Sequence, residues 1–60
     1  MNKFIKLTLE YEELFVNVDF ISSFYRNESM NLTYLYTVGD SEYYTVKETP
    51  AEILDLINGK

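Results

Sequence analysis

Apolar and polar residues alternate at the start of the chain, and this pattern predicts a strand over residues 3–9. The apolar positions are Ile5, Leu7 and Leu9. A period of two is typical of a strand with one buried face. The acidic stretch 10–13 breaks the alternation, and residues 14–16 resume it with Leu, Phe and Val. We therefore expect a β-hairpin with a charged, solvated tip.

The centre of the chain predicts a turn followed by two more strands. Residues 17–19 read Asn-Val-Asp, which favours a turn or a single helical turn because Asn and Asp side chains bond to nearby backbone. Residues 20–25 predict a third extended segment, and the polar residues 26–31 its exit loop. Residues 32–38 are rich in aromatic and β-branched types and give the clearest strand. One face of this strand carries Leu32, Tyr34, Tyr36 and Val38, and the other Thr33, Leu35 and Thr37.

A tight turn at residues 39–41, Gly-Asp-Ser, leads into a last strand that ends at Val46. With a loop of three residues, Tyr36 would lie opposite Tyr44 and Tyr34 opposite Val46. A loop of two residues would exchange the faces, since a slip of one residue turns every side chain over. We favour the longer loop because it gathers the larger apolar set on one face.

The strongest local signal is the start of a C-terminal helix at Pro50. Thr49 can cap it, Pro suits the first helical position, and Glu52 can complete a capping box. The expected apolar stripe is Ile53, Leu54, Leu56 and Ile57, with Glu52 and Asp55 facing water. Asn58 and Gly59 then form a helix stop. So short a helix is unstable alone in water and must pack on the sheet.

These elements predict an α+β fold, an antiparallel meander sheet of four to five short strands with one C-terminal helix packed on one face. A chain of 60 residues has room for one core, so we expect a single domain over residues 1–60. The chain contains no Cys and therefore no disulfide framework.

The composition argues against catalysis, metals and cofactors. Without His or Cys, most pairings of nucleophile and base and the usual zinc sites are excluded. The acidic residues at positions 10, 12 and 13 lack the ordered spacing and the glycine of a calcium loop. Asp19 and Asp40 could be imagined as an acid and base pair, but both lie in turn sequences. We expect no enzyme, no metal site and no cofactor.

The charge limits the partners. Ten acidic and five basic residues give a formal net charge of -5, which repels phosphate backbones and anionic membranes. The longest apolar runs are too short for a membrane span or a signal peptide. We therefore expect a cytoplasmic protein that binds neither nucleic acid nor membrane.

Six tyrosines and four phenylalanines must populate both sheet faces, although one short helix covers only one of them. Tyrosines can half-bury as cross-strand pairs without a partner. The alternative is a contact surface for a protein partner or a second copy in a homodimer, since interfaces are enriched in tyrosine. The expected surface, together with any exposed edge strand, is Phe24, Tyr25, Tyr34, Tyr36, Tyr43 and Tyr44.

A second hypothesis uses the acidity instead. A small acidic domain can act as an inhibitor or phosphate mimic that occupies a basic groove on a nucleic-acid-handling protein. Such binding weakens steeply with salt, whereas binding by apolar burial tolerates salt. The same net charge also serves ordinary solubility.

The order of motifs resembles the small FlbD-type proteins of flagellar operons. The motifs are residues 5–7, 14–17, 19–21 and 44–49, and the resemblance spans about residues 4–57. It implies a strand, an Asn-x-Asp turn, a strand pair and a Val-Lys-Glu-Ser-like segment leading to a helix. The acidic tip and the longer connection at residues 26–31 depart from that pattern. The chain is also similar to short phage or mobile-element proteins of unknown function, which suggests a bacterial or phage origin. The matched positions are structural, so the resemblance implies no functional residue.

Overall fold

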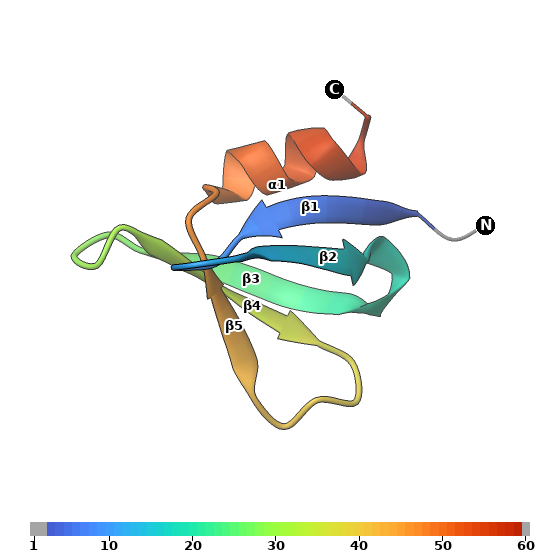
Figure 1. Ribbon diagram of the computed structural model, residues 1–60, viewed down its shortest axis with the longest axis horizontal. Helices are drawn as coiled ribbons and strands as arrows, with labels where there is room; N and C mark the ends of the chain where they lie inside the picture. Colours follow the sequence, from blue (N-terminus) through green and yellow to red (C-terminus); the bar gives the residue numbers. More distant parts are fainter. Residues whose placement is uncertain (1–2, 60) are drawn as a thin grey trace.

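The computed structural model describes residues 3–59, which form five strands, one short 3-10 turn and one helix (Figure 1). In chain order these are β1 (Phe4–Thr8), β2 (Glu13–Asn17), the 3-10 turn η1 (Val18–Phe20), β3 (Ile21–Asn27), β4 (Leu32–Thr37), β5 (Tyr43–Val46) and α1 (Pro50–Ile57). The fold is α+β with antiparallel pairing throughout these strands, as the alternation of residue types predicted.

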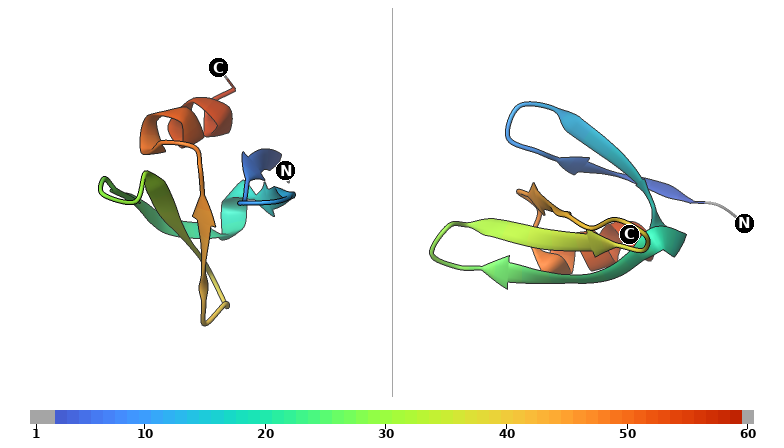
Figure 2. Two further views of the ribbon diagram at one scale, coloured as in Figure 1. Left: turned by 60° about the vertical axis from the view of Figure 1, so that its left-hand side comes forward. Right: turned by 90° about the horizontal axis from the view of Figure 1, so that it is seen from below.

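The single meander sheet that we predicted is wrong, because the strands form two sheets of different size. β1 pairs with β2 in one sheet, and the other has the order β3-β4-β5. The break lies at η1, where the Asn17 side chain accepts a hydrogen bond from the Asp19 backbone N–H at 2.9 Å. This capped turn redirects the chain, so β3 leaves the plane of β2 and pairs with β4 instead (Figure 2). The predicted turn at residues 17–19 is thereby confirmed.

One core joins both sheets and the helix. Its buried apolar residues are Ile5, Leu7, Val16, Leu35, Val46 and Ile53, which come from β1, β2, β4, β5 and α1. The helix packs against β1 and β3, on the side of the three-stranded sheet that faces the core. Since each element supplies only one or two core residues, no pair of them could bury this surface alone.

The end of β1 is tied to the segment between β5 and α1. The Lys47 backbone N–H donates to the Thr8 carbonyl oxygen at 2.9 Å. The Glu48 carboxylate accepts two hydrogen bonds from Thr8 in return. The two sheets are therefore joined directly at this corner as well as through the core.

The structure corrects the boundary of the third strand. β3 continues to Asn27, whereas the sequence predicted an exit loop that begins at Arg26. Arg26 lies opposite Thr33, and its Nη1 donates to the Thr33 hydroxyl and to the Lys47 carbonyl, both at 3.2 Å. These contacts hold a polar residue in the strand. The turn that follows has Asn31 in the left-handed region at φ 55°.

The favoured register around Gly39 is also wrong. Tyr36 lies opposite Tyr43, and Tyr34 lies opposite Thr45, one residue away from the prediction. This is the register that the two-residue loop would give, although β4 already ends at Thr37 and β5 begins only at Tyr43. In the connection the Thr37 hydroxyl donates to the Asp40 carboxylate at 2.6 Å, and Gly39 has φ 88°. Tyr44 and Val46 consequently lie on the core face with Leu35, and not on the face of Tyr34 and Tyr36.

The helix begins and ends where the sequence predicted. The capping box is complete, since the Glu52 N–H donates to the Thr49 hydroxyl oxygen at 3.2 Å and the Thr49 N–H to the Glu52 carboxylate at 2.8 Å. Ile53 is fully buried and Gly59 has φ 79° beyond the last turn. The predicted stripe is too wide by one residue, because Leu54 is exposed.

Across residues 3–59, no helix is long and apolar enough to cross a membrane.

Candidate functional site

Four of the six predicted surface residues lie together on one sheet face. Tyr25 from β3, Tyr34 and Tyr36 from β4, and Tyr43 from β5 all point away from the core. We call this surface, on the side of the β3-β4-β5 sheet opposite α1, the tyrosine face. Figures 1 and 2 show the helix on the other side of this sheet.

The other two predicted residues lie on the opposite side. Phe24 and Tyr44 both flank Leu35, one from each neighbouring strand, and both pack against the core. They are adjacent in sequence to Tyr25 and Tyr43, and successive residues of a strand point to opposite faces. The structure therefore divides the predicted set instead of bringing it together.

The four tyrosine rings form a closed cluster. The Tyr34 ring centroid lies 5.2 Å from that of Tyr25 and 5.0 Å from that of Tyr43. The Tyr36 centroid lies 6.2 Å from that of Tyr25 and 5.5 Å from that of Tyr43. The Tyr34 and Tyr43 rings meet edge to face at 77°, a geometry that aromatic quadrupoles favour. Each ring is thus held by two others across the strands.

The outer tyrosines remain accessible. Tyr25 and Tyr43 are 52% and 50% exposed, while Tyr34 and Tyr36 between them are half-buried. The strands on either side of β4 therefore offer a pair of immobilised rings to solvent.

Within the three strands, the tyrosine face carries no charged side chain, and Glu10 and Lys47 border it at one end, where they line a hollow with Leu32 and Thr45. By the strand pairing it carries Ser23, Tyr25, Asn27, Leu32, Tyr34, Tyr36, Tyr43 and Thr45. Charged residues make up 25% of the chain, so a face of this size without any of them differs from the surface as a whole. Its polar groups are hydroxyls and one amide, which donate and accept hydrogen bonds without charge.

The hydroxyl groups on this face interact. The Asn27 side-chain amide donates to the Tyr34 hydroxyl at 3.2 Å. The pKa of Tyr36 is raised above the usual value of tyrosine, first by a side-chain hydrogen bond with Tyr25 and then by partial burial. The negative charges that Tyr25, Tyr43 and Tyr34 would carry at high pH raise this pKa further. The Tyr36 phenol therefore stays neutral well beyond physiological pH.

Comparisons with protein-family models, curated proteins and solved structures found no match to this chain. The FlbD-type resemblance accordingly stays a prediction.

A second apolar surface was missed by the sequence reasoning. Phe4, Phe15, Phe20 and Val38 are between 56% and 64% exposed and line a hollow of about 430 Å³. The signal for two of them lies in the alternation itself. Phe4 and Phe15 occupy the polar phase of their strands, next to the core residues Ile5 and Val16. An aromatic residue in the outward phase of a strand points to solvent or to a partner.

The acidic residues considered for chemistry serve local structure or lie in solvent. Glu10 and Glu12 are exposed at the hairpin tip, and Glu13 forms an exposed salt bridge with Lys6 at 3.3 Å. Asp19 lies within η1, and Asp40 accepts the hydrogen bond from Thr37. Among the described residues, no group of three or more acidic side chains is placed to hold a metal ion.

Proposed function

We propose that this protein is a small non-enzymatic interaction module that binds a protein surface through its tyrosine face. The observation that carries the proposal is a tyrosine-lined sheet face whose strand residues carry no charge, on a chain of net charge -5. Central regions of protein interfaces are depleted in charged residues and enriched in tyrosine.

The rigidity of the cluster supports this role. Binding costs less when the contacting side chains are already held in one conformation. Tyr25 and Tyr43 each contact both Tyr34 and Tyr36, so their rings are ordered before any partner arrives. Tyrosine also combines a large apolar area with a hydroxyl, which is why it is common among residues that dominate binding energy.

The distribution of acidic residues favours this reading over a phosphate mimic. The acids are spread over the hairpin tip, the turns and the helix, and three of them are engaged in structural hydrogen bonds. A mimic of a phosphate backbone needs a row of charges on one surface. Binding through the tyrosine face should therefore depend only weakly on salt.

A pair of substitutions on the outer rings tests the proposal. Tyr25→Ser with Tyr43→Ser removes the two exposed rings, while Tyr11→Ser removes a ring that is 91% exposed at the hairpin tip and outside the face. Size-exclusion chromatography with light scattering over a concentration series measures self-association. Affinity capture from the source cell, with the captured proteins quantified by mass spectrometry, measures partner binding.

We expect the wild type and the Tyr11 variant to share the same association or captured protein, and the double variant to lose it. Circular dichroism at the assay temperature checks that all three proteins are folded. Identical behaviour of the three folded proteins in both assays would contradict the proposal.

A further inference from the structure

The free edge of β2 borders an apolar groove. Among the described residues β2 pairs only with β1, which leaves its second edge without a strand neighbour. The hollow of about 430 Å³ is lined by the four consecutive residues 14–17 of β2. Because successive residues of a strand point to opposite faces, a hollow that contacts all four runs along the strand edge. In the right-hand view of Figure 2, β2 is the outer strand of its hairpin.

The backbone of β2 presents unpaired hydrogen-bonding groups to this groove. The Val18 N–H donates to the Lys3 carbonyl at 2.9 Å and continues the ladder between β1 and β2. In an antiparallel ladder, alternate residues direct both backbone groups to the same neighbour. Val16 and Leu14 therefore bond to β1, whereas Glu13 and Phe15 direct both N–H and C=O to the free edge. Asn17 directs only its N–H there, because as the N-cap of η1 its C=O accepts the first hydrogen bond of that turn. An extended peptide can add to such an edge as a further strand.

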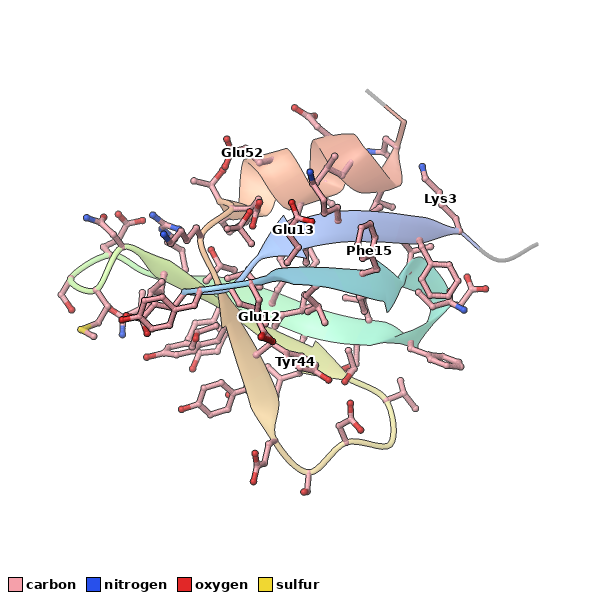
Figure 3. All side chains as sticks on the ribbon, in the orientation of Figure 1. Lys3, Glu12, Glu13, Phe15, Tyr44 and Glu52 are labelled. Carbon is pink, nitrogen blue, oxygen red and sulfur yellow. The ribbon has the colours of Figure 1, made fainter. Side chains whose placement is uncertain are left out.

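The groove offers apolar contacts on both sides of that edge. Phe15 and Phe4 lie on the outer face of the hairpin, and Tyr44 and Val38 form the opposite wall. Figure 3 shows Phe15 and Tyr44 on either side of the β2 ribbon. A strand added here would place one set of its alternate side chains against Phe15 and Phe4 and the other set towards the wall that also carries Asp40.

The charges around the groove select the chemistry of that strand. Asp40 is the charged residue among those that line the groove, and Glu42 lies beside it in an adjoining hollow that shares Asp40 and Tyr44. Glu13 lies on the free edge itself, where its carboxylate is shared with Lys6 through the exposed salt bridge, so Asp40 and Glu42 are the main acidic groups of the rim. With a net charge of -5 behind them, these carboxylates attract basic side chains.

We infer that β2 binds an extended segment of another protein in which apolar and basic residues alternate. The apolar side chains enter the groove, the Lys or Arg side chains meet the acidic rim, and the segment's backbone pairs with Glu13, Phe15 and Asn17. This site lies apart from the tyrosine face and goes beyond the proposed function.

A second copy of the same chain is a poorer occupant. Pairing β2 with β2 would bring together two chains of net charge -5 and place each copy's Glu13 and Asp40 near the other's. Like charges across an interface oppose association. The charge therefore points to a basic partner.

A defined peptide tests the inference. The probe is acetyl-Lys-Val-Lys-Val-Lys-Val-Lys-amide, titrated into isotope-labelled protein while amide chemical shifts are followed. We expect saturable shifts at Phe15, Asn17 and Val38. A first control peptide carries N-methyl groups on its valines, so it keeps the charge but lacks the valine N–H donors. A second has Glu in place of Lys, so it keeps the alternation but reverses the charge. Both should bind at least about tenfold more weakly.

Two protein variants separate this site from the tyrosine face. Phe15→Ser with Val38→Ser should weaken peptide binding about tenfold, because both apolar walls lose area. The Tyr25→Ser, Tyr43→Ser double variant should bind the peptide with wild-type affinity. The peptide titration therefore tests the β2 site independently of the function proposed for the tyrosine face. The inference is overturned if no saturable shifts occur at β2, if either control peptide binds as well as the probe, or if the groove variant, shown to be folded by its amide spectrum, retains wild-type affinity.

Discussion

The Glu48 carboxylate accepts two hydrogen bonds from Thr8, one from its backbone N–H and one from its hydroxyl, each at 2.8 Å. The two residues are 40 positions apart and partly buried. The contact joins the end of β1 to the segment that leads from β5 into α1. It therefore links the two sheets at a corner where no strand of one sheet pairs with a strand of the other.

Removing this carboxylate should destabilise the fold. Glu48→Ala leaves both Thr8 donors without their acceptor. A hydrogen bond to a charged group contributes about 1.5–3 kcal/mol to stability. We expect the free energy of unfolding in urea to fall by about that amount. Glu48→Gln keeps one acceptor oxygen and should lose less. Glu12→Ala, at the exposed hairpin tip, is the matched control and should leave the transition unchanged. Equal urea midpoints for the Ala variants would contradict the assigned role.

The buried hydroxyl of Thr33 makes a second link at the same corner. Thr33 is fully buried, its hydroxyl donates to the Glu48 carbonyl at 2.6 Å, and it accepts from Arg26 Nη1 at 3.2 Å. Thr33→Val fills the same volume but leaves the Glu48 carbonyl without this donor, at a cost of about 1–3 kcal/mol, while Arg26 Nη1 keeps its bond to the Lys47 carbonyl. Thr33→Ser keeps the hydroxyl and loses only a methyl group.

The comparison of these two variants in thermal unfolding isolates the hydrogen bonds from the packing. We expect Thr33→Val to be less stable than Thr33→Ser. Thr45→Val, on the tyrosine face, controls for the same chemical change at a half-buried strand position. The reverse order at position 33 would show that the methyl group matters more than the hydroxyl.

The elements that sequence predicted correctly are those set by neighbouring residues. The capping box at Thr49 and Glu52 is a local interaction, so its pattern sufficed to place the helix. The alternation along β4 likewise predicted which residues share a face, and Thr33, Leu35 and Thr37 lie together on the buried one. It did not predict which of the two faces is covered.

The incorrect predictions depend on contacts between distant residues. The register of β5 follows from the Thr37 and Asp40 hydrogen bond and from the core that Val46 enters, and neither can be read from the residues beside Gly39. Phe24 and Tyr25 are neighbours, so only one of them could share a face with the other tyrosines. Which one does so depends on where the core lies. The groove beside β2 is set by the separation of the two sheets, which the strand patterns alone do not encode.

The turn at Gly39 has space for a side chain, but its backbone conformation is unfavourable for residues other than glycine. A Cβ atom at this position would meet no atom within 4 Å, yet the backbone has φ 88°. Gly39→Ala should therefore lower the free energy of unfolding by about 1 kcal/mol through backbone strain alone. Gly39→Asn should lower it less, because Asn adopts positive φ more readily. Urea titration of both, beside Ser41→Ala in the same loop, measures the difference. An Ala variant as stable as the wild type would show that this loop relaxes freely.

The protein should become less stable in alkaline solution because of Tyr36 on the tyrosine face. Because the pKa of Tyr36 is raised in the folded protein, the native state keeps this proton after the unfolded chain releases it near pH 10. The contribution of Tyr36 is fully present below about pH 10 and is lost as the pH rises through its folded-state pKa. We expect the free energy of unfolding to fall with rising pH in that window. Tyr36→Phe should make the fall shallower, and Tyr11→Phe, which removes a phenol at the hairpin tip, serves as the control. Urea unfolding at roughly pH 8, 10 and 11 measures the slope. If stability falls with pH as steeply in Tyr36→Phe as in the control, the raised pKa of Tyr36 does not contribute to the stability of the fold.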